Sequence, residues 1–305
     1  MDDKPALLEM RDLRVGLGRS GSAARREVLH GIDLQVHAGR TLGIVGESGS
    51  GKSMTALAIM GLLPDGADMR GSIRLEGREL VGLPNAQLRA LRGDRMAMVF
   101  QEPMTALNPL HTIGDQVAEP LRLHRRMGKR QALECAAALL ERVGIAQARA
   151  RLGAYPHQFS GGQRQRITIA MALACGPGLL IADEPTTALD GIVQRQILDL
   201  LDDLVTEDRM GMVLISHDLA VIAEYTDEVA IMTGGRIVES GATEQVFAHP
   251  QHPYTQQLLQ SRQRLAAFLD KAIEQEGQDG NGNGNGHHSA AKPGGAAAPT
   301  VQEAA

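Results

Sequence analysis

Short apolar runs alternate with longer segments of helical periodicity along most of this chain. Four runs, TLGIVG, MAMVF, LLIAD and MVLIS, are almost wholly apolar, which is typical of central strands covered on both faces. The first closes residues 28–45, where short β-type runs occur, and the others lie at 96–100, 179–183 and 212–216. Helices that alternate with such strands predict an α/β fold with a mainly parallel sheet. Ligands of these sheets bind at the carboxyl ends of the strands.

The segments around these runs predict further elements. GSIRLEG at 71–77 is another β stretch, and residues 84–92 have the pattern of a helix. Residues 103–174 carry apolar positions at helical spacing, which predicts a helical subdomain inserted into the sheet domain. A short β-ribbon at 229–241 precedes helical pieces around 243–270.

Composition separates one globular domain, residues 1–265, from a C-terminal extension, residues 266–305. Hydrophobic residues make up 43% of the 305 residues, which is enough for a real core. From Gly277 the sequence is GQDGNGNGNGHHSAAKPGGAAAPTVQEAA, which has almost nothing to bury. We therefore expect disorder from about residue 277.

Charge, cysteine content and hydropathy exclude several classes of protein. The formal net charge of -5 gives no general attraction to nucleic acid or anionic lipid, and we expect no nucleic-acid partner. Cys135 and Cys175 are too few for a disulfide framework or a four-thiolate iron-sulfur cluster, and the N-terminus lacks the apolar run of a secretory signal. The longest uncharged stretch, 167–182, is shorter than the roughly 18 to 20 residues of a membrane span. A role at a membrane would therefore require docking onto another subunit.

The segment GESGSGKS, Gly46 to Ser53, matches the pattern of a phosphate-binding loop. It follows an apolar strand and precedes the helical pattern MTALAIMGLL, as such a loop requires. Its glycines let backbone N–H groups turn toward phosphate at a helix N-terminus. Lys52 is expected to contact the β and γ phosphates of ATP, and Ser53 to hold Mg²⁺.

Two further segments carry candidate chemistry. LLIADEP delivers Asp183 to the end of a strand, where it can bind Mg²⁺, and Glu184, which can polarise a water, although a helix N-terminus also attracts acids. FSGGQRQR at 159–166 opens a helix at Ser160, which can present a hydroxyl and free N–H groups to an anion. An ordinary N-cap is the alternative for Ser160.

Together these segments resemble the ATP-binding cassette (ABC) superfamily over about residues 6–260. GESGSGKS looks like its Walker A motif, FSGGQRQR like its signature motif and LLIADEP like its Walker B motif. The order and spacing of the motifs also match. The resemblance implies a P-loop NTPase (RecA-like) parallel sheet core with an antiparallel β subdomain and an inserted helical subdomain.

The same resemblance implies roles for individual residues. Gln101 becomes the Q-loop glutamine, Asp190 in TTALD the D-loop aspartate and His217 in LISHD the switch histidine. The implied catalytic residues are Glu184, His217, Lys52 and Gln101, and the implied Mg²⁺ ligands are Ser53, Gln101 and Asp183. In one subunit ATP would be bound by Gly46, Ser48, Gly49, Ser50, Gly51, Lys52, Ser53 and Met54. The implied nucleotide-binding residues also include Ser160, Gly161, Gly162, Gln163 and Asp190, and in a head-to-tail pair Ser160 and Gly162 would act on the ATP of the other subunit.

Two segments indicate a branch of the superfamily. FQEPMTALNPLHT at 100–112 and HPQHPYTQQLL at 249–259 resemble the ATPases of peptide and nickel importers. This implies a second cassette, two transmembrane permease subunits and, indirectly, an extracytoplasmic solute-binding protein, at the cytoplasmic face of the inner membrane. His249 and His252, like His287 and His288, lie among prolines or glycines, which favours a structural role over a metal site.

The chain departs from the family pattern at two places. Family members usually stack adenine on an aromatic residue upstream of Walker A, whereas every aromatic residue of this chain follows it. Arg19, Arg25 or Arg26 is the candidate replacement, and we expect weakened discrimination between ATP and GTP. A Gly/Asn tail stands where many peptide-importer cassettes have a proline-rich, cysteine-bearing extension.

Several alternatives stay open at this point. A nickel or opine-type importer would share the same motifs, and so would a non-transport ABC ATPase. The long coiled-coil insertions of repair ATPases and the second cassette of translation ATPases are not in this sequence, and Glu184 and His217 argue against a module that binds ATP without hydrolysing it. The partner cassette is either a second copy or, as the peptide branch favours, a related chain.

Overall fold

The computed structural model describes residues 5–18, 26–101, 106–187 and 189–260. The chain divides into two compact units, Met1–Leu259 and Gln260–Ala305, and the fold given below is that of the first unit. The tail expected to be disordered from about residue 277 lies outside the described residues. Within the described ranges, no helix is both long enough and apolar enough to span a bilayer.

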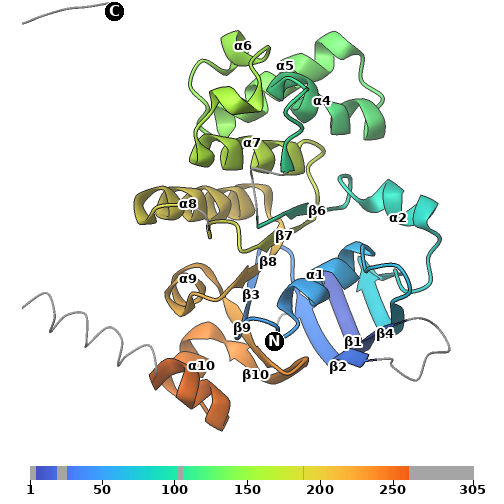
Figure 1. The fold of residues 1–305 in the computed structure, drawn as a ribbon, viewed down its shortest axis with the longest axis vertical. Helices are drawn as coiled ribbons and strands as arrows, with labels where there is room; N and C mark the ends of the chain where they lie inside the picture. The colour runs from blue at the N-terminus through green and yellow to red at the C-terminus, as the bar shows by residue number, and fades with distance from the viewer. Residues whose placement is uncertain (1–4, 19–25, 102–105, 188, 261–305) are drawn as a thin grey trace, which may run out of the picture. The chain divides into compact units, whose positions relative to one another are not determined.

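A six-stranded, mainly parallel sheet forms the centre of this unit (Figure 1). The strand order is β10-β9-β3-β8-β7-β6, and only β10 runs antiparallel to its neighbour. The strands are β3 (Thr41–Val45), β6 (Met96–Val99), β7 (Leu179–Asp183), β8 (Gly211–Ser216), β9 (Glu228–Thr233) and β10 (Arg236–Ala242). All four predicted apolar runs form strands of this sheet, which confirms the predicted α/β class.

A second sheet of four antiparallel strands has the order β2-β1-β4-β5. Its strands are β1 (Leu8–Leu17), β2 (Arg26–Val36), β4 (Asp68–Leu75) and β5 (Arg78–Glu79). The sequence pattern does not predict β1, although β1 lies between β2 and β4. Its alternation is broken at Asp12, which has φ 41°, and the register with both neighbours shifts there.

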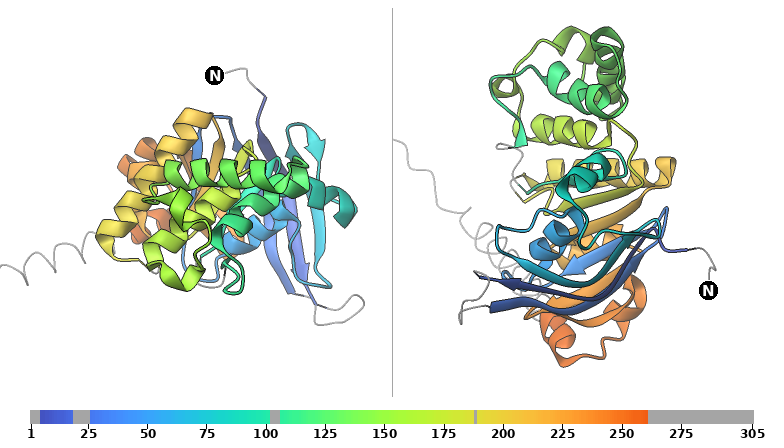
Figure 2. Two further views of the ribbon diagram at one scale, coloured as in Figure 1. Left: turned by 90° about the horizontal axis from the view of Figure 1, so that it is seen from above. Right: turned by 90° about the vertical axis from the view of Figure 1, so that its right-hand side faces the viewer.

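Helix α1 (Lys52–Met60) lies between the two sheets (Figure 2, right). Its buried Ile59 belongs to the same hydrophobic cluster as Leu8 of the antiparallel sheet and Ile181 of the central sheet. The next helix, α2 (Asn85–Leu91), adds Leu88 to this cluster. Burial from two sides therefore fixes the position of α1 and of the loop that precedes it.

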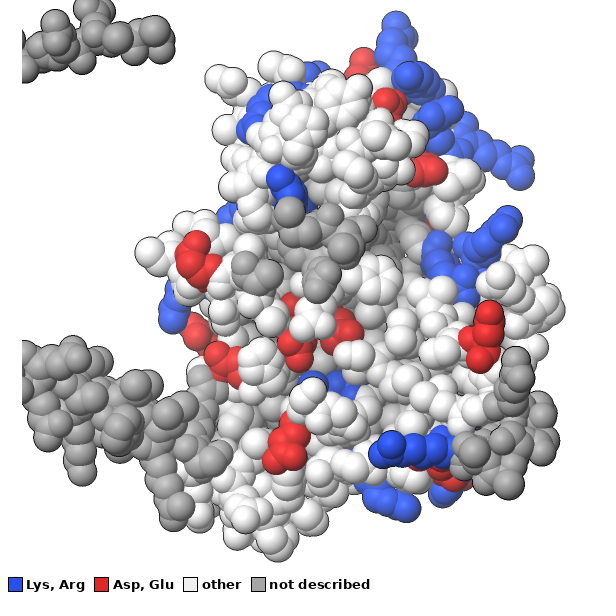
Figure 3. Space-filling model, viewed as in Figure 1, with Lys and Arg blue, Asp and Glu red and all other residues white. Residues whose placement is uncertain are grey.

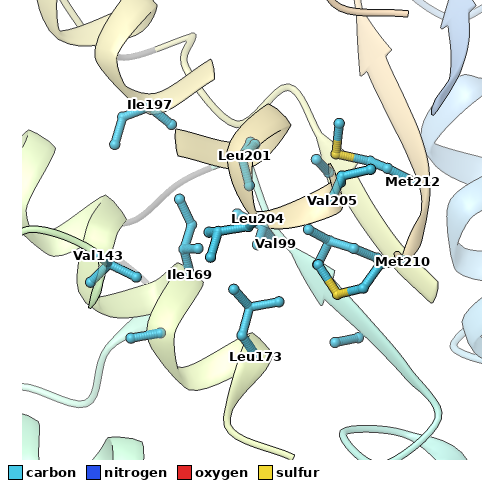
Figure 4. Packing of buried hydrophobic residues seen from close by; sticks show 14 of the residues in the cluster. Val99, Val143, Ile169, Leu173, Ile197, Leu201, Leu204, Val205, Met210 and Met212 are labelled. Carbon is cyan, nitrogen blue, oxygen red and sulfur yellow. The ribbon is translucent and has the colours of Figure 1, made fainter. Parts of the chain in front are cut away.

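The predicted inserted subdomain is helical. It consists of α4 (Ile113–His124), α5 (Lys129–Arg142), α6 (Ala148–Arg151), the 3₁₀ helix Pro156–Gln158 and α7 (Gly161–Leu173). Figure 4 shows its packing on the rest of the unit, where Ile169 and Leu173 of α7 meet Leu201 and Leu204 of the long helix α8 (Gly191–Asp208). One continuous core thus joins the insertion to the central sheet.

Short helices complete the unit. They are α9 (Leu219–Tyr225) and α10 (Thr243–Ala248), followed by helical residues 253–260. The face drawn in Figure 3 carries both charge signs, with basic side chains gathered along one edge of the helical subdomain and near α2.

Candidate functional site

The phosphate loop runs from the end of β3 to the start of α1. Gly46 is required there because a Cβ would lie 2.0 Å from the carbonyl oxygen of Met232. Gly49 and Gly51 have φ 78° and 108°, a region that favours glycine. Gly51 is the N-cap of α1 and supplies no side-chain hydrogen bond. The first N–H groups of α1 are therefore free of side-chain caps and face the loop, as anion binding requires.

Lys52 closes over this loop. Its Nζ donates to the carbonyl oxygens of Gly46 at 2.7 Å and Glu47 at 2.9 Å, and the residue is only 6% exposed. Burial lowers the pKa of Lys52, while the nearby carboxylates of Glu184 and Asp183 act in the opposite direction. The ammonium group thus lies in a partly dehydrated place, where a phosphate charge would interact strongly.

Asp183 lies at the end of β7 and faces the phosphate loop. It accepts a hydrogen bond from Ser53 Oγ at 3.2 Å and is 7% exposed. Burial raises the pKa of Asp183, and the Ser53 hydrogen bond opposes the rise. A hydroxyl and a carboxylate oxygen side by side are hard donors of the kind Mg²⁺ takes, and Mg²⁺ usually keeps several waters and needs few protein ligands. The residues present fit this ion, although no cluster of three His, Cys, Asp or Glu side chains suited to a metal occurs among the described residues.

Glu184 follows Asp183 with φ 46°, an uncommon conformation for a residue other than glycine. Its N–H donates to the carbonyl oxygen of Ile215 on β8 at 2.9 Å, which anchors this turn. Three side chains converge on one oxygen, Glu184 Oε2. They are Gln101 Nε2 at 3.1 Å, His217 Nδ1 at 3.2 Å and Thr187 Oγ1 at 2.9 Å.

Thr187 is the one member of this cluster that the sequence does not predict. Its hydroxyl contacts both the side chain and the backbone carbonyl of Glu184, the latter at 3.3 Å. The only signal for it is its place in ADEPTT, three residues after the glutamate. Gln101 and His217, which come from loops after β6 and β8, do lie beside Glu184 as the strand order requires.

These groups surround a cavity of about 490 Å³, which is in the size range of small-ligand sites. Its lining includes Ser48, Gly49, Gly51, Lys52, Ser53, Met54, Gln101, Glu184 and His217, together with Val28 of β2. Ser50 is buried at the edge of the same loop. Of the three arginines considered for the base, Arg26 is an exposed residue of β2, and Arg19 and Arg25 lie outside the described residues.

The signature residues are located at the N-terminus of α7. Ser160 Oγ accepts from the N–H of Gln163 at 3.3 Å, and the Gln163 side chain accepts from the N–H of Ser160 at 3.2 Å. Gly162 packs so closely on α8 that a Cβ would lie 2.5 Å from Val193 Cγ1. Gly161 and Ser160 are exposed. This is the capping box that the alternative interpretation expected, on an accessible surface.

Asp190 caps the neighbouring helix α8, where its Oδ1 accepts from the N–H of Val193 at 3.0 Å. The contacts described for Asp190 and for Ser160 to Gln163 are with α7, α8 and the neighbouring Leu189, not with Lys52, Asp183 or Glu184. Figure 1 shows α7 in the helical subdomain, apart from α1. Within one chain, the structure therefore brings together the Walker A, Walker B, Gln101 and His217 residues, and it places the signature residues elsewhere.

Comparisons with known proteins agree with this geometry. The family model described as ABC transporter matches residues 29–187, and that described as oligopeptide/dipeptide transporter, C-terminal region, matches residues 238–286. The second match includes the HPYT segment and the first part of the Gly/Asn tail.

A putative peptide import ATP-binding protein of Brucella melitensis is 55% identical over 241 residues, which cover 77% of this chain and 71% of that protein. The oligopeptide transport ATP-binding protein OppD of Escherichia coli is 47% identical and covers 86% of this chain and 77% of its own length. Among solved structures, a dimeric ATP-binding cassette in a post-hydrolysis state with ADP and Pi is similar, with a TM-score of 0.68, 27% identity, and coverage of 77% of this chain and 98% of that one. The chain therefore belongs to the ABC transporter family, as an ATP-binding subunit of the branch that carries the oligopeptide/dipeptide transporter C-terminal region.

Proposed function

We propose that this chain hydrolyses ATP to energise an importer of peptides or related solutes, at the cytoplasmic face of the cell membrane. One observation carries the hydrolytic part: Gln101, Thr187 and His217 hold a single carboxylate oxygen of Glu184, at the edge of the cavity that Lys52 lines. The names of the B. melitensis and E. coli relatives support the peptide substrate.

In this proposal the phosphate loop binds the nucleotide. Lys52 exchanges the carbonyls of Gly46 and Glu47 for β and γ phosphate oxygens, and the N–H groups after Gly49 and Gly51 surround the β phosphate. Ser48, Ser50 and Met54 complete the loop and its first helical turn.

Ser53, Asp183 and Gln101 would hold Mg²⁺. The ion, when bound, neutralises negative charge on the β and γ phosphates. Ionised Asp183 is required for this, so its burial makes metal binding sensitive to acid.

Glu184 orients the attacking water, and its three partners fix the direction of its carboxylate. His217, whose side chain is 61% exposed, can reach a γ phosphate in the cavity. Gln101 donates to Glu184 and precedes the helical subdomain in sequence, so it would sense both the γ phosphate and a docked membrane subunit.

The signature residues act on the nucleotide of a second cassette subunit. Their exposure at the N-terminus of α7 and their separation from Lys52 support this, as does the dimeric state of the similar cassette. The proposed residues are Ser160, Gly161, Gly162, Gln163 and Asp190. Two transmembrane permease subunits and, through them, an extracytoplasmic solute-binding protein complete the assembly.

Mg²⁺-dependent ATP hydrolysis by wild type and by Glu184→Gln tests the proposal. We expect the variant to lose about 10²- to 10⁴-fold in rate, because general-base assistance is removed while the shape of the site is kept. It should still bind ATP and should form an ATP-stabilised dimer in size-exclusion chromatography. Glu207→Gln, which changes an exposed carboxylate beside Arg142, is the matched control and should hydrolyse at the wild-type rate. An active Glu184→Gln variant would refute the assignment.

Nucleotide preference is a second measurable property of the proposed site. The described lining of the cavity includes Val28 and no aromatic ring, so we expect ATP and GTP to bind with similar affinity. Competition of each nucleotide against a fluorescent ATP analogue measures this. A strong preference of wild type for ATP would contradict this expectation. If that preference survived Arg26→Ala, Arg26 would not be the residue that recognises the base.

A further inference from the structure

One carboxylate of the central sheet holds the turn at the start of the HPYT segment that marks this branch. Glu239, on β10, accepts from the backbone N–H of Gln251 at 2.8 Å and from that of His252 at 3.0 Å. The Gln251 side chain donates to the carbonyl oxygen of His249 at 2.8 Å, which closes the turn on itself. The segment therefore has a defined conformation, in which the backbone carbonyl of His249 and the backbone N–H of His252 make hydrogen bonds of the turn.

Pro253 begins a helix in this segment, where its lack of an N–H is tolerated. The N–H of Tyr254 donates to His252 Nδ1 at 3.2 Å, and Thr255 is completely buried. The ring of Tyr254 packs, partly buried, against the larger hydrophobic cluster. These contacts hold the ring in place.

The Tyr254 hydroxyl reaches the phosphate loop. The backbone N–H of Glu47 donates to the Tyr254 hydroxyl oxygen at 3.3 Å, across 207 positions of sequence. The carbonyl oxygen of the same residue, Glu47, accepts from Lys52 Nζ at 2.9 Å. The second residue of the loop is thus held at its N–H by a residue distant in sequence and at its C=O by the lysine of the loop itself.

We propose that Tyr254 is a positioning residue for the phosphate loop, and that the HPYT segment serves to deliver it there. The inference rests on the proposed function, since it concerns the ATP site of that function. The phenol keeps the N–H of Glu47 turned away from the cavity, so that the loop enters its turn with the later N–H groups directed at the β phosphate.

The size of the effect follows from the contact. One neutral hydrogen bond changes an equilibrium by a net amount that corresponds to about two- to tenfold. Without the hydroxyl, the loop would spend part of its time in conformations that do not bind phosphate, and the observed affinity falls by that fraction. ATP and ADP should lose affinity by the same factor, because both present a β phosphate.

Tyr254→Phe in the full chain tests this, because it removes only the hydroxyl and keeps the packed ring. Tyr225→Phe is the matched control: its hydroxyl donates to Asp199 Oδ1 at 2.7 Å, between α9 and α8, so it loses a hydrogen bond that does not reach the loop. Affinities for ATP and ADP are measured by titration with Mg²⁺ present, alongside the unfolding temperature without nucleotide. Glu239→Gln is a second variant that loosens the same turn from its other end.

We expect Tyr254→Phe to bind ATP and ADP about two- to tenfold more weakly, with KM raised and kcat at saturating ATP unchanged. Tyr225→Phe should bind both nucleotides as wild type does, and Glu239→Gln should resemble Tyr254→Phe. Wild-type affinity in Tyr254→Phe, or an equal loss in Tyr225→Phe, would overturn the inference. A wild-type chain that binds ATP but does not hydrolyse it would overturn the proposed function alone, since the affinity comparison is still readable.

Discussion

The N-termini of α1 and α7 both have backbone N–H groups without partners in the helix, but the two ends are capped differently. At α1 the N-cap is Gly51, in a left-handed conformation and without a side-chain cap, so the first turn is open to a ligand. At α7 the side chains of Ser160 and Gln163 each satisfy a backbone N–H of the other residue. One helix end is prepared for an anion, whereas the other is stable as an ordinary helix start.

The two helix ends also differ in burial. Lys52 and Asp183 are buried beside the phosphate loop. Burial lowers the pKa of Lys52 and raises that of Asp183, so in both residues it favours the neutral form. Ser160 and Gly161 lie on the surface. The phosphate-loop residues are thus gathered within one chain, whereas the signature residues lie on its surface, where the proposed function assigns them to the nucleotide of a facing subunit.

A mixture of two inactive variants tests whether the two helix ends belong to one composite site. Lys52→Ala and Ser160→Ala should each lower hydrolysis by about 10²- to 10³-fold, as for loss of one preorganised donor. If two copies pair head to tail, a mixed pair has one complete site, formed by Lys52 of one copy and Ser160 of the other. Activity should therefore return on mixing, measured as phosphate release.

Size-exclusion chromatography of wild type in ATP establishes first that the chain pairs with itself. A mixture as inactive as its two components would contradict the assignment of Ser160 to the facing subunit.

Glycine substitutions compare the rigidity of the two halves. In Gly46→Ala the new methyl meets a backbone oxygen of β9 at 2.0 Å, and in Gly162→Ala it meets a side-chain methyl of Val193 at 2.5 Å. A backbone oxygen can move away from the new methyl less easily than a side-chain methyl can. Gly46→Ala should therefore lower the free energy of unfolding by at least about 1–3 kcal/mol, and Gly162→Ala by less. Denaturant unfolding measures both. Gly153→Ala, which meets open space, is the control, and the reverse ranking would show that the signature half is the more rigid.

The smallest expected effect concerns the buried charge of Asp183. The pKa of Asp183 in the folded state is raised above the ordinary value of 3.8. The ionised carboxylate therefore destabilises the folded protein at neutral pH, and this loss disappears at low pH, where Asp183 is protonated in both the folded and the unfolded state. Asp183→Asn should therefore unfold at a higher temperature than wild type at neutral pH. The difference should vanish as the pH falls below about 3.8. Thermal unfolding without nucleotide checks this; a variant less stable than wild type at neutral pH would contradict it.

Most of the fold could be predicted because the central strands are buried on both faces and read as unbroken apolar runs. Strand β1 could not, since its alternation is interrupted at Asp12, where a register shift places Arg11 and Asp12 together on the exposed side. The bulge becomes visible only when β2 and β4 are in place.

The placement of Lys52, Asp183 and Glu184 near one another was predictable, because a motif names each residue, while their roles stay predictions. The placement of Thr187 was not predictable, because it depends on the turn that Glu184 makes at positive φ. Tyr254 was recognised as part of a segment but could not be joined to Glu47, since no local pattern reports a contact between such distant residues.

Strand β3, which leads into the phosphate loop, pairs on one side with β8 and on the other with β9. Both partners come from near the end of the described chain. During synthesis on the ribosome, both edges of β3 therefore stay unpaired until residues 211–233 have emerged. Open apolar edges are templates for wrong pairing, and such distant pairing forms slowly. The nucleotide site is therefore among the last parts of the molecule to mature, and a nascent chain that stalls before β8 leaves both edges of this apolar strand unpaired.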